Sequence, residues 1–397
     1  MTLAQLLRSI AAPDASVPIR QLVLVVVAVG VVVLLVRLFW MAERWLAFKP
    51  TFEASPLWAD VADLTLSQLD TAVSERRRDS GYELGEGNEA CVVWAPTKSK
   101  GSGRGQQQRV KRRKTPLAIV YIHGWSAGVG EHRSTVVELG SRLGANVVCW
   151  RLSGHGRVNN TPTAENRQMV EFATVPNFYM DAVDALLVGL RLGERVVLVG
   201  SSTGAALHTT VAARAPMALK SRVAALVGFS PAYYIANPVY PIVGPLLAAV
   251  RALLPREAAR SLSALLLMPV AGRYRCNLPA LNEEHGRQWT LRYPTKGVLT
   301  SMECIWEAGH LDFKTQIGCP CFFAGNDRDH VVDWAVTISP QIYGSLKSVP
   351  RVALTVDPRP GDHPHVLGSA LVSPGTVGEI TDAAATFLGT YAGLVYA

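Results

Sequence analysis

A serine flanked by two glycines stands between an apolar run and a helix-favouring run. The apolar residues VVLV (196–199) lead directly into Gly200-Ser-Ser-Thr-Gly204, and an Ala-rich stretch follows. A Gly-x-Ser-x-Gly turn between a strand and a helix lifts the serine hydroxyl above the sheet edge, and only glycine fits the crowded flanks. The pattern therefore predicts that Ser202 is a nucleophile.

A serine hydroxyl is a weak nucleophile near neutral pH, so it needs a base and a group that orients the base. Further along the chain, CFFAGNDRDHVVD follows a late apolar run with Asp327 and Asp329, and VDPRPGDHPHVLG carries His363 and His365. Each pair is predicted in a loop at the same sheet edge as Ser202. The order serine, acid, histidine indicates a catalytic triad, and the residue pattern leaves both acids and both histidines open.

Two backbone N–H groups are expected to stabilise the oxyanion of such a reaction. Thr203 begins the helix after the nucleophile, where the unpaired amides carry partial positive charge. The loop YIHGWSAG (121–128) follows an earlier strand and supplies the N–H of Trp125. Two donors of this kind typically contribute several kcal/mol to transition-state stabilisation.

The elements that position these residues alternate along the chain. Continuous apolar strands separated by amphipathic helices indicate the α/β class, with a doubly wound, mostly parallel sheet covered on both faces. The expected strands are 89–96, 117–124, 145–152, 195–200, 223–231, 319–325 and 351–356, and the expected helices are 134–144, 175–193, 206–216 and 376–391.

Other segments depart from this alternation. Residues 232–315 are unusually apolar and are predicted to form a helical lid inserted between strands. Residues 1–20 form an N-terminal tail, and residues 43–80 a connector with helical patches. Residues 98–114 lack large apolar side chains apart from one valine, and we expect a disordered basic loop. Attraction to anionic lipid and a localisation signal are the alternatives for this loop.

A membrane segment is predicted near the N-terminus. Residues 22–36, LVLVVVAVGVVVLLV, hold no polar side chain, and the apolar character continues after Arg37. At ~1.5 Å per residue a transmembrane helix over 21–42 crosses the roughly 30 Å hydrocarbon core. A buried core helix and a cleaved signal peptide are the alternatives, but no small-x-small cleavage site follows. We expect a single-pass membrane protein, and the balanced flanking charges leave its orientation open.

The net charge of +8 has a local origin. Eight basic residues and no acid lie in the segment 98–114, and the other 31 basic residues equal the 31 acidic ones. The rest of the chain therefore offers no basic binding face, and no nucleic-acid partner is expected.

Several other reactive side chains are predicted to be structural. Six scattered cysteines do not form a disulfide framework, and Cys319-Pro-Cys321 lacks the two-residue spacer of a redox or zinc pair. Cys149 is expected to be a buried thiol. The histidines given a structural role are His123, His155 and His208.

The sequence resembles the α/β-hydrolase superfamily over roughly residues 85–395. The motifs that carry the resemblance are HGWSAG, RLSGHGR, GSSTGA, DHVVD and HVL. Within the superfamily it is similar to monoacylglycerol lipases, lysophospholipases and serine aminopeptidase-like hydrolases. The resemblance implies an α/β-hydrolase fold over 81–397. It also implies Asp329 as the acid, with Asp327 as alternate, and His365 as the base in preference to His363. The basic loop, the anchor and the lid depart from the family pattern.

The sequence thus predicts a membrane-anchored serine hydrolase that cleaves carboxylic esters through Ser202, His365 and Asp329, with no metal or organic cofactor implied. The apolar lid and anchor favour a lipid-like substrate such as a monoacylglycerol or lysophospholipid. An acyltransferase, thioesterase or peptidase with the same triad, and a non-catalytic membrane-tethered scaffold, are the alternatives.

Overall fold

The computed structural model of the chain describes residues 51–52, 55, 63–75, 84–96, 112–157, 166–237, 254, 258, 261–263, 265 and 275–393. The chain divides into two compact units, one of residues 1–48 and 241–259 and a larger one of 49–240 and 260–397. Nearly all described residues belong to the larger unit. The predicted transmembrane helix over 21–42 lies outside the described residues, among which no helix is long and apolar enough to cross a bilayer.

A seven-stranded sheet forms the centre of the larger unit, with strand order β1-β3-β2-β4-β5-β8-β9. All neighbouring strands run parallel except the edge pair β1 and β3, which is antiparallel. The predicted mostly parallel sheet is confirmed. The strands are β1 (Cys91–Val93), β2 (Thr115–Ile122), β3 (Asn146–Trp150), β4 (Gly193–Ser201), β5 (Val223–Phe229), β8 (Cys321–Gly325) and β9 (Arg351–Thr355).

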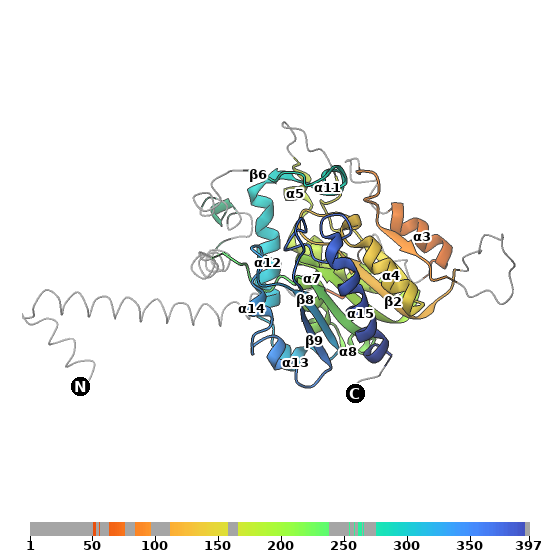
Figure 1. Cartoon of the computed structure of the whole chain (residues 1–397). Coiled ribbons are helices and arrows are strands. Elements are labelled where there is room, and N and C mark those ends of the chain that lie inside the picture. The colour runs from red at the N-terminus through yellow and green to blue at the C-terminus, as the bar shows by residue number, and fades with distance from the viewer. Residues whose placement is uncertain are drawn as a thin grey trace, which may run out of the picture. The chain divides into compact units, whose positions relative to one another are not determined.

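Helices cover the sheet (Figure 1). Helix α15 packs on α4, and both contact the sheet, whereas α6 and α7 contact each other and the central strands, with α12 against α7. The helices of four or more residues whose bounds lie within the described residues are α3 (Leu66–Glu75), α4 (Arg133–Leu143), α5 (Gln168–Glu171), α6 (Val175–Leu192), α7 (Thr203–Arg214), α8 (Met217–Lys220), α11 (Glu283–Gln288), α12 (Val298–Gly309), α13 (Phe313–Gln316), α14 (Trp334–Thr337) and α15 (Val377–Tyr391).

The apolar runs of the sequence account for the central strands. Residues 196–201 of β4 and all of β3, β5 and β8 are buried, as expected for strands covered on both faces. Helix α6 begins where the Thr174 hydroxyl accepts a hydrogen bond from the N–H of Asn177, with proline in the first turn, and ends at Gly193. These elements hold the carboxyl ends of β4 and β8 at one rim.

The described part of the insertion 232–315 differs from the predicted helical lid. It contains α11 and α12, but also a two-stranded antiparallel ribbon of β6 (Arg275–Asn277) and β7 (Arg292–Pro294). The strands are three residues long, too short for a periodic pattern to mark them in the sequence. Most of the apolar stretch from 238 to 274 lies outside the described residues.

The connector and the basic loop also contact the domain where they are described. Leu69 and Val73 of α3 are buried, and the Ser55 hydroxyl donates to Asp184 at 2.9 Å. Of the basic loop, residues 112–114 are described. Arg112 pairs with Asp70 at 2.9 Å, so the predicted disorder does not extend to the end of this segment.

Candidate active site

The backbone of the strand-to-helix turn is strained at Ser202. Ser202 has φ 50° and ψ −116°, a conformation that costs a non-glycine residue free energy. Its N–H donates to the carbonyl of Phe229 at 2.9 Å, which ties the turn to β5. A Cβ built on Gly204 would lie 2.2 Å from the carbonyl oxygen of Ile122, so only glycine fits there.

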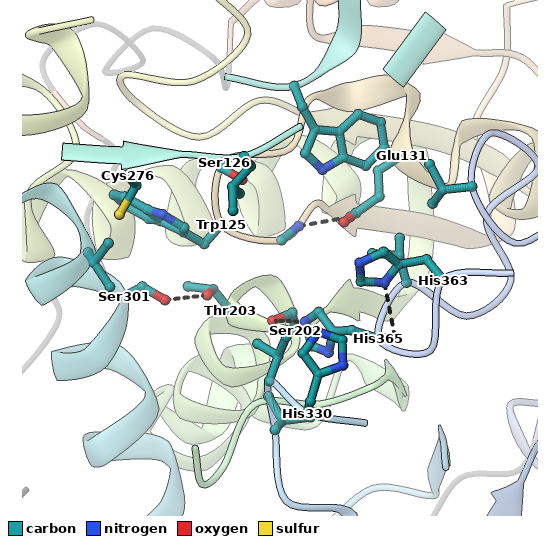
Figure 2. A pocket seen from close by; sticks show the side chains of 18 of the residues that line it. Trp125, Ser126, Glu131, Ser202, Thr203, Cys276, Ser301, His330, His363 and His365 are labelled. Carbon is teal, nitrogen blue, oxygen red and sulfur yellow. Dashed lines mark hydrogen bonds between the residues drawn. The ribbon is translucent and has the colours of Figure 1, made fainter. Parts of the chain in front are cut away.

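Three side chains far apart in the sequence meet at this turn in a continuous chain of hydrogen bonds. His365 Nε2 lies 3.0 Å from Ser202 Oγ, and His365 Nδ1 lies 2.7 Å from Asp329 Oδ2. All three residues are less than one-tenth exposed. Because Asp329 is an acceptor, the Nδ1 proton is directed to it, which leaves Nε2 free to accept the serine proton. Figure 2 shows the contact between His365 and Ser202.

The backbone after β8 holds Asp329 in its ionised form. Its Oδ1 accepts from the N–H groups of Val331 at 2.8 Å and Val332 at 3.1 Å. Burial acts to raise the pKa of Asp329, but the facing His365 and these amides outweigh it and lower the pKa below its ordinary value. The carboxylate is therefore available to orient and stabilise an imidazolium at His365.

The alternate acid and histidine, Asp327 and His363, are not members of this chain of hydrogen bonds. Asp327 is exposed, whereas Asp329 contacts the imidazole. His363 is half-buried and lines the same cavity, and its Nδ1 accepts the backbone N–H of His365 at 3.1 Å. Burial lowers the pKa of His363 to about 4, with a further contribution from His365, so it stays neutral near pH 7.

The two expected oxyanion donors face the same space from opposite sides. Thr203 is buried at the start of α7, and Trp125 follows β2 above it (Figure 2). Both residues line one cavity with Ser202 and His365. The N–H groups of a helix start and of a loop can converge there on a single oxygen.

Glu131 is a buried side chain at the site that the sequence did not indicate. It belongs to η3 (Val129–Glu131), is 3% exposed, and accepts from the Gly124 N–H and the Tyr121 hydroxyl, both at 2.8 Å. Burial alone would raise the pKa of Glu131, but His132, His123 and the Gly124 amide lower it to about 2. The carboxylate thus fixes the residue just before Trp125.

The histidines expected to be structural are buried. His123 Nε2 accepts the N–H of Leu152 at 3.1 Å, so its Nδ1 donates to the Gly124 carbonyl at 2.8 Å. Burial lowers the pKa of His123 to about 4 and of His208 to about 3. His155 packs against Trp125 with ring centroids 5.0 Å apart. None of these side chains bonds to Ser202.

The cysteines and possible metal ligands form no second centre in the described part of the chain. None of the six cysteines, all of which are described, forms a disulfide, and Cys149 is fully buried as predicted. Within the same residues no three His, Cys, Asp or Glu side chains gather as a metal-binding group.

A cavity of about 570 Å³ opens above Ser202. One side carries His330, His363 and Glu131, and the other is formed by α12 with Val298, Met302 and Ile305. The insertion thus supplies the apolar wall, and the loops after β2, β8 and β9 supply the polar one.

Comparison with known proteins places the chain in a family. Residues 119–374, more than half of the chain, match the Alpha/beta hydrolase family. The chain belongs to this family. The part of this alpha/beta hydrolase that matches the family model contains the parallel strands β4, β5 and β8 and the turn at Ser202. No curated protein matches it in sequence.

Solved structures of similar fold include three described as lipolytic enzymes. One, reported with the metagenome-derived LipS and LipT, has 16% identity and a TM-score of 0.53, covering 78% of this chain and 100% of that chain. A soluble variant of the Saccharomyces cerevisiae monoglyceride lipase has 13% identity, 78% and 94% coverage and a TM-score of 0.42. The Paleococcus ferrophilus monoacylglycerol lipase has 14% identity and a TM-score of 0.43, covering 69% of this chain and 95% of that chain. At 16% identity, the likeness to the first of these structures shows the fold alone.

Proposed function

We propose that this alpha/beta hydrolase is a serine hydrolase that cleaves carboxylic ester bonds. The observation that carries the proposal is the uninterrupted chain from Asp329 through His365 to Ser202 at a strained strand-to-helix turn. Such a chain raises the nucleophilicity of a serine hydroxyl, which otherwise reacts slowly near neutral pH.

The reaction proceeds in two halves. Ser202 Oγ attacks the ester carbonyl carbon while its proton moves to His365 Nε2, and the carbonyl oxygen becomes an oxyanion facing the N–H groups of Trp125 and Thr203. His365 then gives this proton to the departing alkoxide, which leaves an acyl-serine. Water attacks the acyl-serine with His365 as base, and Ser202 recovers its proton when the acid departs.

The cavity supports a lipid-like acyl group as the substrate. The α12 wall is apolar at Val298, Met302 and Ile305, and Ile235 and Val332 add apolar surface. Binding an acyl chain there removes apolar surface from water, at about 25 cal/mol per Å². A monoacylglycerol or a lysophospholipid meets this requirement.

The N-terminal anchor is part of the proposal and rests on the sequence. The apolar residues 22–36 are long enough, with the flanking apolar residues, to cross a bilayer. A carbonate extraction of membranes containing the full chain tests it: the protein is expected to stay in the pellet, and its release would remove the anchor from the proposal.

An activity-based probe tests the chemistry directly. A fluorophosphonate is expected to label the wild-type chain, and Ser202→Ala is expected to lose both labelling and hydrolysis of p-nitrophenyl esters. Thr210→Val is a matched control, because it removes a buried hydroxyl of α7 that donates to Ala206 at 3.0 Å, away from the cavity.

The possible results separate the competing functions. A folded wild-type chain that takes no label would support a non-catalytic scaffold and overturn the proposal. A labelled chain with faster turnover of thioesters or peptides than of monoacylglycerols and lysophospholipids would keep the nucleophile and replace the ester substrate.

A further inference from the structure

Two hydroxyl groups from different parts of the chain meet beside the nucleophile. Thr203 Oγ1, at the start of α7, lies 2.6 Å from Ser301 Oγ of α12. Thr203 is fully buried and Ser301 is 4% exposed, yet both residues line the cavity above Ser202. The pair therefore faces the site and not bulk water.

The pair has more hydrogen-bond donors than the protein satisfies. Each hydroxyl carries one O–H donor and two acceptor lone pairs, and the contact between them uses one of the two donors. Among the residues that the structure describes, neither hydroxyl has another hydrogen-bond partner. One O–H is thus left without an acceptor among the described residues, and a buried donor in that state lowers stability.

The other residues of α12 that line the cavity around Ser301 are apolar. Along α12 the residues that line the cavity are Val298, Ser301, Met302 and Ile305, which share one helix face at spacings of three and four. Ser301 is the polar member of this face. A serine at a position where leucine or valine would extend the apolar wall indicates a role toward what the cavity binds.

The geometry of the reaction places this wall on the acyl side. The leaving group must lie toward His365, because His365 Nε2 returns the proton to it. Figure 2 shows Thr203 and Ser301 on the opposite side of Ser202 from His365 and His363. Thr203 directly follows the nucleophile, so the pair lies next to the first carbons of the acyl chain.

We propose that the Thr203–Ser301 pair is a subsite for an oxygen atom carried by the acyl chain close to the ester carbonyl. The substrate class is then an ester of an oxygen-substituted acyl group, with an ether, hydroxyl or carbonyl oxygen that accepts the free O–H. An all-carbon chain leaves this donor unpaired, and an oxygenated chain satisfies it. The inference rests on the proposed ester hydrolysis at Ser202 and deepens it.

Matched esters test the subsite in the full-length chain. p-Nitrophenyl pentanoate is compared with p-nitrophenyl ethoxyacetate and 3-methoxypropanoate, which exchange a single CH₂ for oxygen. The measured quantity is the ratio of kcat/KM for each oxygen analogue to kcat/KM for the pentanoate. The double variant Ser301→Ala/Thr203→Val removes both O–H donors and is expected to lower this ratio about tenfold for at least one analogue, relative to wild type. Differences in intrinsic ester reactivity cancel between wild type and variant.

Neighbouring variants control for structural effects. Thr300→Val removes the adjacent hydroxyl of α12, which is buried and donates to the Ala173 carbonyl at 2.7 Å, and the ratio is expected to stay within about twofold. Ser301→Thr keeps a hydroxyl and is expected to keep the ratio. Thr203→Val keeps the backbone N–H. Each single variant, Ser301→Ala or Thr203→Val, leaves one O–H free and is expected to keep more of the ratio than the double variant does.

The outcomes separate this inference from the proposed function. An unchanged ratio in the double variant Ser301→Ala/Thr203→Val would overturn the subsite while leaving ester hydrolysis intact. Equal slowing of all three esters would also overturn it, because the hydroxyl would then act on the oxyanion or on folding. Wild-type turnover of p-nitrophenyl pentanoate, lost in Ser202→Ala, reports separately on the proposed function.

Discussion

The serine turn and the loop that carries His365 are held in place by different forces. Ser202 sits between β4 and α7, where Gly204 packs so closely on the end of β2 that no side chain fits. His365 lies between β9 and η6 (Pro374–Thr376), in a loop without regular secondary structure. Backbone packing fixes Ser202, the proposed nucleophile, whereas His365 depends on side-chain hydrogen bonds.

Those hydrogen bonds come from the segment at the start of α4. Each joins a side chain to a backbone carbonyl, and each pairs residues more than 230 positions apart. The bonds are His132 Nε2 to the Leu367 carbonyl at 2.6 Å, the Thr135 hydroxyl to the Gly368 carbonyl at 2.5 Å, and the Ser369 hydroxyl to the Glu131 carbonyl at 2.6 Å. The same segment holds the oxyanion loop through Glu131 and Gly124, so one short stretch positions two parts of the site.

The strongest test of this contrast is a methyl group at the serine turn. In Gly204→Ala the new Cβ would lie 2.2 Å from the Ile122 carbonyl oxygen and 2.6 Å from that of His123. Neither backbone atom can move without shifting β2, so we expect a loss of about 3 kcal/mol or more of unfolding free energy and no measurable esterase activity. Urea unfolding and ester turnover measure the two effects.

A second glycine provides the control. Gly389 lies in α15 with no atom within 4 Å of an added Cβ, so Gly389→Ala is expected to raise the unfolding free energy by about 0.5–1 kcal/mol. Equal stability of the two variants would show that the turn is not held by close packing.

The next largest effect distinguishes the two histidines of the loop. His365→Ala removes the group that contacts Ser202, and kcat is expected to fall about a thousandfold. His363→Ala removes an acceptor for the His365 N–H, and activity is expected to stay within about tenfold of wild type. Steady-state kinetics on one ester compares kcat of the two variants. Equal losses of kcat would show that His365 is wrongly assigned as the base.

A smaller effect is expected when one of the loop hydrogen bonds is removed. Thr135→Val leaves the Gly368 carbonyl without this donor in a buried site, which typically costs about 1–3 kcal/mol. We expect kcat to fall about threefold to tenfold with little change in KM, because the loop carries His365. Thr386→Val, at an exposed position of α15, is the control and is expected to change neither the unfolding free energy nor kcat. A pure stability loss without a kcat effect would show that the loop is positioned by other contacts.

The same contrast explains how far the sequence predicts the molecule. The turn at Ser202 is local: its apolar strand, two glycines and helix are contiguous, so the fold around it follows from composition and spacing. The choice of Asp329 over Asp327 rested on a family resemblance. In the structure it is Asp329, and not the exposed Asp327, that bonds to His365.

The remainder depends on contacts between distant residues. Glu131 follows the HGWSAG loop, but only folding shows that its carboxylate turns back to the Gly124 N–H. Ser301 lies in an apolar helix, and its meeting with Thr203 requires the insertion to pack on α7. The ribbon β6–β7 has three-residue strands, so tertiary pairing and not local pattern determines it.

The smallest predicted effect concerns pH and lies under the serine turn. His208 of α7 is fully buried, and burial lowers its pKa from 6.5 to about 3 against a small opposing contribution from the Val199 backbone. The folded state therefore excludes a proton that the unfolded chain binds below pH 6.5. The contribution of the neutral His208 to the unfolding free energy is fully present above pH 6.5 and is lost as the pH falls toward 3. Lowering the pH from about 7.5 to about 5 is expected to reduce the free energy of unfolding by about 2 kcal/mol through His208. Urea titrations at the two pH values measure this effect: between them, the unfolding free energy of His208→Leu is expected to fall by about 2 kcal/mol less than that of wild type. An equal fall in both proteins would show that His208 is protonated in the folded state.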